Sequence, residues 1–353
     1  RAERVGGAPT VPARWLARLE LAARQAAGAI GDRTPNPLAE GAERWLAWAA
    51  ALDPAAGGPP PDLPAVAPPV EARFRDLSVS DVERWVRDPY GHYARHILRL
   101  YPLEAIDQEP DAADRGNTLH HVLHAFVATL TPGVWPEDAP AQLLALGEQA
   151  FAPFRDRPGV HAFWWHRFCR MAGWYAGHEA GRWPALAAAA TERELRGPVS
   201  VAGTSVDLRA RLDRLDRMED GGFVVIDYKS GSLPALEPAP DKAWTASAAR
   251  AWSPQLPLEG MLVLQQHAGA DLEALEAWAV GGGRDTPGEA KDLTEKTEPV
   301  AAAEQAWAGL ERLLAQFADP TMPYLSEPRP LLAPRYSDYR HLARTGQDEG
   351  GDA

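Results

Sequence analysis

The chain has 353 residues, of which 45% are hydrophobic and 24% charged, and its formal net charge is −13. This composition is typical of a folded globular protein and excludes disorder throughout. A single cysteine, Cys169, excludes an intramolecular disulfide framework and a four-cysteine zinc or iron–sulfur site built from this chain alone. The excess of acidic over basic residues argues against a protein that binds nucleic acid without regard to sequence, because such proteins normally present a basic surface.

Membrane and export signals are missing from the sequence. No window approaches the roughly 18 uninterrupted apolar residues of a transmembrane helix, and no apolar signal-peptide stretch follows the first residues. We therefore expect a reducing, cytoplasmic setting. Because the first seven residues contain no methionine, we also expect the chain to be a piece of a longer protein.

The N-terminal part of the chain is predicted to be helical up to a proline-rich linker. Segments 11–29 and 38–52 place their large apolar residues at helical intervals. Residues 53–70 contain seven prolines, a composition that packs neither as helix nor as sheet and indicates an extended linker. We therefore predict a helical segment over 1–52, a main domain over 71–345 and a disordered tail over 346–353.

The first half of the main domain is also predicted to be helical. Ser80 and Glu83 have the spacing of a capping box and should open a helix whose inward face carries Val82, Trp85 and Val86. Amphipathic spacing predicts three further helices, over 115–130, 140–152 and 161–189.

Near residue 191 the hydrophobic period changes from about 3.6 to 2, which predicts strands. Three alternating segments follow one another, 191–201, 204–218 and 221–231, and Asp220-Gly221-Gly222 is a hairpin signal between the last two. The remaining elements are a helix over 253–267, a strand over 276–280 and a helix over 300–318. The fold class is therefore α/β, a mixed sheet flanked by helices.

Two acidic residues and a lysine in these strands carry the chemistry. Strand alternation places Asp227 and Lys229 on the same face, and a hairpin can bring Asp213 beside Asp227. Two carboxylates beside a lysine form an oxygen-rich pocket suited to Mg²⁺ or Mn²⁺. The apolar run VVI before Asp227 indicates a buried strand, where an unpaired carboxylate is costly, and so favours function over a solvated surface pair.

Four short motifs in order, RGNTLHHVLHAF, RLDRLDR, IDYKSG and SPQLPLEG, resemble those of the RecB-type PD-(D/E)xK nuclease domain. The resemblance covers about residues 74–345 and is strongest to the C-terminal nuclease domain of the AddB family, subunits of AddAB helicase–nucleases. It implies a restriction-endonuclease-like core. The residues that match the family's functional positions are His120, Asp213, Asp227, Lys229 and Gln255.

The resemblance also implies a mechanism, metal-assisted hydrolysis of phosphodiester bonds. The implied ligands of Mg²⁺ or Mn²⁺ are His120, Asp213, Asp227 and the backbone carbonyl of Tyr228. Lys229 would position the attacking water or stabilise the developing negative charge. Gln255 would orient Lys229 or the DNA backbone.

Neighbouring residues offer weaker candidates. His120 and His124 have the i, i+4 spacing of a zinc pair, but the HExxH glutamate and an obvious third ligand are missing. Asp216 is expected to form a salt bridge rather than bind metal. Glu192 and Glu194 could approach the metal from the preceding strand, but a solvated edge position is favoured.

The sequence departs from iron–sulfur members of the AddB family. Asp88-Pro89-Tyr90 stands where they have Cys-Pro-aromatic, so we expect no cluster. Cys169 is expected to be a buried apolar residue. Packing of Tyr336 and Tyr339 is expected to close the domain instead.

The resemblance implies an exonuclease that cuts single strands of DNA as duplex ends are unwound during double-strand break repair by homologous recombination. This subunit would cut the 5′-ended strand and its partner, the AddA helicase–nuclease subunit, the other. The first 20 residues resemble the last helicase motif region. Arginines are expected near the site, where they would partly offset the acidic charge: Arg95, Arg99, Arg209, Arg211, Arg214 and Arg217.

Three alternatives remain open at this point. The first is a catalytically silent DNA-binding or scaffolding module, against which the complete set of motif residues argues. The second is a stand-alone RecB-like exonuclease without a helicase. The third is a zinc hydrolase built on His120 and His124, which metal analysis would separate.

Overall fold

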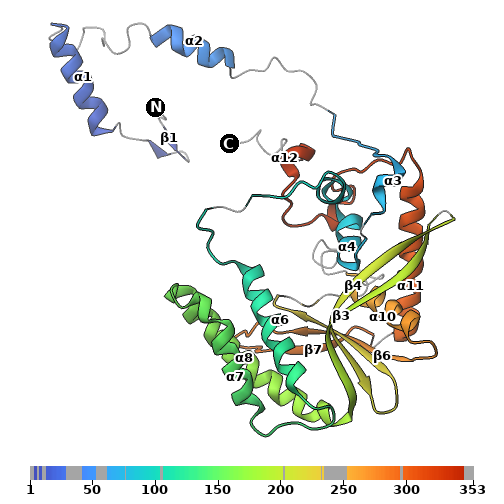
Figure 1. Cartoon of the computed structure of the whole chain (residues 1–353). Helices are drawn as coiled ribbons and strands as arrows, with labels where there is room; N and C mark the ends of the chain where they lie inside the picture. Colours follow the sequence, from blue (N-terminus) through green and yellow to red (C-terminus); the bar gives the residue numbers. More distant parts are fainter. Residues whose placement is uncertain are drawn as a thin grey trace. The chain divides into compact units, whose positions relative to one another are not determined.

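The structure of the chain is a computed structural model (Figure 1). It divides into two units, Arg1–Asp62 and Leu63–Ala353. The structure describes residues 4–5, 8–9, 13–28, 42–52, 62–75, 77–103, 106–201, 203–231, 233, 253–294 and 297–345. The predicted tail over 346–353 and most of the predicted linker therefore lie outside the described residues.

The first unit contains the two predicted helices, α1 (Arg14–Ala26) and α2 (Ala42–Leu52), and a short antiparallel pair of β1 (Arg4–Val5) with β2 (Ala8–Pro9). Several large apolar side chains of the two helices are exposed, among them Trp15, Leu19, Trp45 and Leu46.

The second unit is built on a five-stranded mixed sheet in the order β3-β4-β5-β6-β7. Its strands are β3 (Leu186–Val201), β4 (Thr204–Met218), β5 (Phe223–Lys229), β6 (Leu272–Ala279) and β7 (Glu289–Asp292). All neighbours are antiparallel except β5 and β6, which are parallel and joined by a crossover that contains α10 (Gln255–Gln266). The predicted fold class is confirmed.

Strands β3, β6 and β7 differ from the prediction, and β6 begins at Leu272 rather than at residue 276. Helix α8 (Pro158–Arg182) was expected to continue to residue 189, but β3 already begins at Leu186. Pro184 explains the early end of the helix, because proline cannot donate an intrahelical hydrogen bond. The acidic stretch around residue 290 contains the edge strand β7, where no strand was predicted; its four residues are too short to show an alternating pattern.

The remaining helices of the second unit are α3 (Val70–Arg73), α4 (Val79–Arg87), α5 (Pro89–His92), α6 (Ala112–Thr129), α7 (Ala139–Ala150), α11 (Pro299–Ala318) and α12 (Arg340–Ala343). A π-helical turn, η1 (Tyr93–Ile97), follows α5, and 3₁₀ turns are formed by Ala152–Phe154, Trp183–Ala185 and Pro330–Leu332. None of the helices in the described part of the chain has the length and apolar character needed to cross a membrane.

The N-cap of α4 lies two residues earlier than predicted. Ser78, not Ser80, is the extended residue whose hydroxyl accepts a hydrogen bond from the backbone N–H of Asp81. Both serines have an acidic residue three positions later, so the pattern alone selects neither. The start of α4 at Val79 decides the cap.

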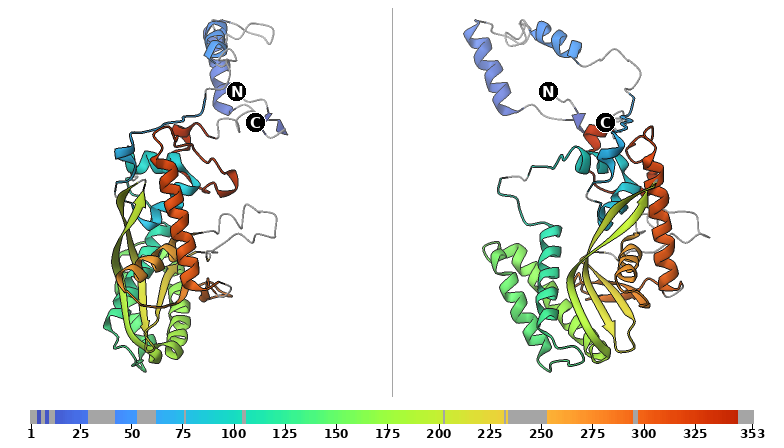
Figure 2. Two further views of the ribbon diagram at one scale, coloured as in Figure 1. Left: turned by 90° about the vertical axis from the view of Figure 1, so that its right-hand side faces the viewer. Right: turned by 45° about the vertical axis from the view of Figure 1, so that its right-hand side comes forward.

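The sheet is covered by helices on both faces (Figures 1 and 2). Strand β5 shows why: Val225 packs in one core with residues of α4, α10 and α11, while Val224 and Ile226 pack in the other with residues of α6, α7 and α8. Each such side chain contributes roughly 1.5–3 kcal/mol by its burial. The apolar run before Asp227 is therefore a central strand, as predicted.

The C-terminal segment closes against the start of the unit. Tyr339 is buried and its hydroxyl donates to the carbonyl of Leu100 at 2.6 Å, as expected, but Tyr336 is exposed. Asp88 caps α5 by accepting from the N–H of Gly91. Cys169 is half-buried rather than buried, because α8 packs one stripe of its surface against the core.

Candidate metal centre

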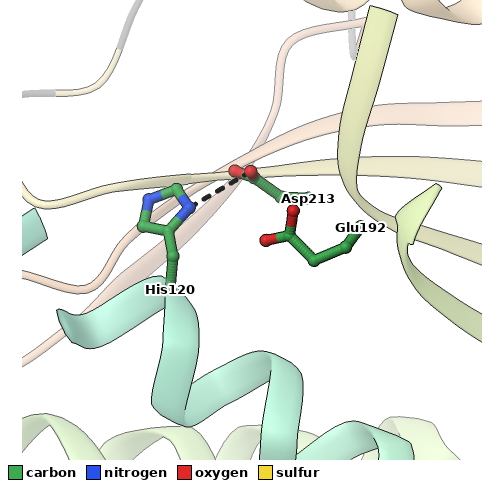
Figure 3. A group of neighbouring side chains, drawn as sticks. All are labelled: His120, Glu192 and Asp213. Carbon is green, nitrogen blue, oxygen red and sulfur yellow. Dashed lines mark hydrogen bonds and ion pairs between the residues drawn. The ribbon is translucent and has the colours of Figure 1, made fainter. Parts of the chain in front are cut away.

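Three potential metal ligands converge from three elements of the second unit (Figure 3). They are His120 on α6, Glu192 on β3 and Asp213 on β4, and one donor atom of each lies within 4.8 Å of the others. His120 Nδ1 lies 3.1 Å from Asp213 Oδ1, although 93 positions separate the two residues in sequence. Imidazole and carboxylate groups in this arrangement form a ligand set suited to a divalent cation.

The second carboxylate oxygen of Asp213 is held by the neighbouring strand. Its Oδ2 accepts a hydrogen bond from the backbone N–H of Tyr228 at 2.8 Å. The Tyr228 ring is buried in the core, and its hydroxyl lies 3.1 Å from that of Tyr175 on α8. The β4–β5 pairing thus orients Asp213 through a backbone group of Tyr228, while the tyrosine side chain anchors β5.

Asp227, Lys229 and Gln255 form a second, directly connected group. The Lys229 ammonium donates to Asp227 Oδ1 at 3.0 Å and to Gln255 Oε1 at 3.1 Å. The Gln255 amide in turn donates to Asp227 Oδ1 at 3.0 Å. Asp227 Oδ2 lies 2.7 Å from the ammonium but accepts no hydrogen bond from any described residue, although Asp227 is only 3% exposed.

Sequence reasoning missed a fourth member of this group, Glu259. It is fully buried on α10, and its Oε1 accepts from the Gln255 amide at 3.0 Å. The i, i+4 spacing from Gln255 was the signal that could have found it.

The charges of the two groups shift one another's pKa values. Burial raises the pKa of Asp227 to about 6, against the opposing effect of Lys229. Burial alone would lower the pKa of Lys229, but the charge of Asp227 outweighs it and the pKa is raised. Burial would likewise lower the pKa of His120, but its hydrogen bond to Asp213 raises it. Burial and then the charge of Asp227 raise the pKa of Glu259 well above its usual value.

The residues present fit a divalent cation. Crowded carboxyl groups with raised pKa values repel one another when ionised, and a cation would relieve that repulsion. The buried Oδ2 of Asp227, without a hydrogen bond, is an oxygen that a metal could bind. An imidazole with several carboxylates is a donor set suited to Mn²⁺ or Mg²⁺.

Glu192 corrects one expectation. Its side chain lies in the ligand group and forms an ion pair with Arg211. The sequence had favoured a solvated position on an edge strand for Glu192 instead. Its φ of 54° inside β3 is a local distortion of the strand, which sequence alternation does not predict. Glu194, two positions later, is exposed.

Two other residues have structural partners. His124 Nδ1 lies 2.5 Å from the Thr191 hydroxyl, so among the described residues it is not part of the ligand group. Asp216 is buried and pairs with Arg182 and Arg214, as the salt-bridge prediction requires.

Arg214 itself was expected to help attract DNA, but it is fully buried. Its guanidinium binds both carboxylate oxygens of Glu179 on α8, at 2.8 and 3.1 Å, and donates to Asp216 at 2.7 Å. A residue so enclosed cannot contact DNA, and its role is to join β4 to α8.

Residues 76–335 match the family model of the PD-(D/E)XK nuclease superfamily. The chain belongs to this superfamily. Membership implies a metal-dependent nuclease.

Among curated proteins, the chain is similar to uncharacterized proteins of Rickettsia. It is 24% identical to one from Rickettsia typhi over 217 residues, which are 60% of this chain and 24% of that protein. It is also 24% identical to one from Rickettsia bellii, over 54% of this chain and 22% of that protein. The chain thus spans about a quarter of the length of these relatives. A solved structure, that of SSO0001, matches at 15% identity and a TM-score of 0.24, over 56% of this chain and 85% of that one.

Proposed function

We propose that the chain is a Mg²⁺-dependent (or Mn²⁺-dependent) deoxyribonuclease that hydrolyses phosphodiester bonds in single-stranded DNA. The observation that carries the proposal is the convergence of His120, Asp213, Asp227 and Lys229 from one helix and two strands. In a superfamily of nucleases, that convergence favours catalysis over a silent binding module.

The metal would be held by His120, Asp213, Asp227 and the backbone carbonyl of Tyr228, with Glu192 as a further ligand. A bound Mg²⁺ supplies positive charge for the scissile phosphate and a more acidic water. Lys229 keeps its positive charge, because its pKa is raised, and its ammonium can stabilise negative charge that develops on the phosphate.

Gln255 acts through Lys229. Its side-chain oxygen accepts from the ammonium while its amide donates to Asp227, so it holds the two charged groups at a defined separation. Such preorganisation limits the reorganisation needed when charge develops during the reaction. We infer that Gln255 is a positioning residue rather than a catalytic one.

We further propose that the chain serves as the nuclease part of an AddB-type subunit in recombinational repair of double-strand breaks. The support is the order of the four motifs and the helicase-like character of the first 20 residues. In that setting it would cut the 5′-ended single strand as an exonuclease, and the AddA subunit would cut the other. The rest of the complex would supply most of the DNA affinity, since the chain is acidic.

The decisive experiment is Mg²⁺-dependent cleavage of end-labelled single-stranded DNA by the chain, beside Asp227→Ala and a control variant, Asp207→Ala. Asp207 is an exposed carboxylate on β4 and therefore matches the charge change. We expect cleavage by the wild type and by the control but not by Asp227→Ala. Equal cleavage by wild type and Asp227→Ala would overturn the assignment of the site.

The AddB-type setting needs its own measurement. The chain is assayed with purified AddA and a duplex labelled separately at its 5′ and 3′ ends. The proposal expects cleavage of the 5′-ended strand to depend on Asp227. Failure of AddA to bind the relevant full-length protein would contradict this setting while leaving the nuclease activity untouched.

A further inference from the structure

A cavity of about 670 Å³ in the second unit lies apart from the metal centre and is lined by cationic and aromatic groups. Its lining residues are Ala72, Arg75, His96, Ile97, Arg99 and Tyr101, with no carboxylate among the described ones. We call it the arginine cavity. The lining is thus locally basic, although the chain as a whole has 49 acidic and 36 basic residues. Its volume lies within the range of small-ligand sites.

The side chains of the arginine cavity are available for a ligand. Tyr101 is 60% exposed, and the guanidinium of Arg95 lies over its ring at 5.3 Å. Arg75 donates through Nε to the carbonyl of Glu71, which leaves its two terminal nitrogens without a described partner. Arg99 forms no ion pair with a described residue. Cations beside an exposed ring are the combination that binds single-stranded nucleic acid.

The backbone around the cavity is irregular. The π-helical turn η1 (Tyr93–Ile97) supplies two lining residues, and Arg99 has a φ of 56°, in the left-handed region that favours glycine. Both features cost conformational energy, and both are frequent where a backbone presents ligand-binding groups.

A second cavity, of about 260 Å³, includes two residues of the group around Asp227 in its lining. It is lined by the start of α4, by residues of β3 and β4, and by Gln255 and Glu259. His96 of the first cavity lies 3.1 Å from Asp81 of α4, and the first residues of that helix line the second cavity. Helix α4 therefore contacts a residue of the first cavity through Asp81 and contributes its first residues to the second.

We propose that the arginine cavity binds a nucleotide of the single-stranded DNA substrate, away from the bond that is cut. Arg75 and Arg99 would contact phosphate oxygens, and Tyr101 would stack on a base. The strand would then pass through the second cavity to the metal centre. This inference rests on the proposed function for the identity of the ligand.

The test is binding of fluorescein-labelled 20-nucleotide single-stranded DNA to the full chain, by anisotropy, in EDTA so that no cleavage occurs. The variants are Arg75→Gln/Arg99→Gln, Tyr101→Ala, Tyr101→Phe and a control, Arg155→Gln. Arg155 is exposed and follows α7, and its one hydrogen bond is to the carbonyl of Glu148 at 3.5 Å. Unchanged thermal unfolding confirms that each variant is folded.

Quantitative outcomes follow from the chemistry of each contact. The double arginine variant should lower the slope of log affinity against log salt by about 1.4, since each phosphate contact contributes about 0.7 with a single strand. Tyr101→Ala should weaken binding about tenfold, and Tyr101→Phe should retain wild-type affinity because it keeps the stacking ring. The control should bind as the wild type does.

The proposal is overturned if either the double arginine variant or Tyr101→Ala binds like the wild type, or if the wild type does not bind the oligonucleotide. Because binding is measured without metal, it does not depend on catalysis. Weaker binding by the cavity variants together with no Mg²⁺-dependent cleavage by the wild type would support the cavity and contradict the proposed nuclease function.

Discussion

Two charged clusters occupy neighbouring positions on β4 and differ in how their polar groups are satisfied. Around Arg214 the charges are enclosed and paired: Glu179 and Asp216 accept from its guanidinium, and all three side chains are fully buried. One residue earlier, Asp213 lies in a group of neighbouring carboxylates, and the buried Oδ2 of Asp227 has only the Lys229 ammonium, at 2.7 Å, as a charged partner among the described residues.

This difference separates a structural cluster from a functional one. Buried ions that are completely paired serve the fold, and their removal leaves partners uncompensated. Convergent carboxylates that remain incompletely satisfied cost stability unless something else binds there. Both clusters contain buried carboxylates, and the balance of charge separates their roles: Glu179 and Asp216 face two arginines, whereas Asp227 and Glu259 share the single lysine Lys229.

The largest predicted effect is on stability, from Arg214→Met. It leaves Glu179 and Asp216 buried without their shared cation and should lower the free energy of unfolding by about 3–5 kcal/mol. Urea denaturation measures the change. Arg217→Met, an exposed arginine on the same strand, should cost less than about 0.5 kcal/mol. Equal losses in the two variants would show that the buried cluster has no special structural role.

Lys229→Met addresses the other cluster and should reduce the rate of DNA cleavage about 10²- to 10³-fold, because it removes charge that stabilises the phosphate in the transition state. Single-turnover cleavage at saturating Mg²⁺ gives the rate. Lys291→Met, on the exposed edge strand β7, is the matched control and should cleave like the wild type. A wild-type rate for Lys229→Met would remove the lysine from the mechanism.

Metal addition should distinguish the clusters without any assay of activity. At about 100 times its dissociation constant, Mg²⁺ or Mn²⁺ should stabilise the wild type by about 2.7 kcal/mol, which raises Tm by about 5 °C. Asp213→Asn should abolish that increase, since it removes a ligand. Asp207→Asn should leave the increase in place. A metal-induced shift that survives Asp213→Asn would locate the cation elsewhere.

The smallest effect is expected for Glu192→Gln, which keeps the size of the side chain but removes a charged ligand. We expect metal affinity to fall about tenfold, comparable to the loss of an interaction that supports a metal site. Isothermal titration with Mn²⁺ measures the affinity. Glu194→Gln, on the same strand but exposed, should bind metal as the wild type does. Identical affinities would place Glu192 outside the coordination sphere.

Local patterns predicted most of the elements that build the site. Periodicity located α6, α10 and β5, and the hairpin at Asp220–Gly222 follows from residues that favour a tight turn; Gly221 there has a φ of 101°. The predicted ends of the helices were less accurate than their positions. The end of α8 and the N-cap of α4 depend on one or two residues rather than on a repeating pattern.

The sequence by itself determined the chemical groups and their strand context: an Asp-x-Lys at the end of an apolar strand, a second aspartate before a hairpin, and a histidine on an amphipathic helix. These are local properties, set by side-chain alternation and helical period. Only the tertiary structure decided that Glu192 joins His120 and that Arg214 is enclosed. The first relation joins segments far apart in the chain, and the second depends on which face of a twisted strand the residue lies on. Both are determined only when helices pack on the two faces of the sheet and bury these side chains.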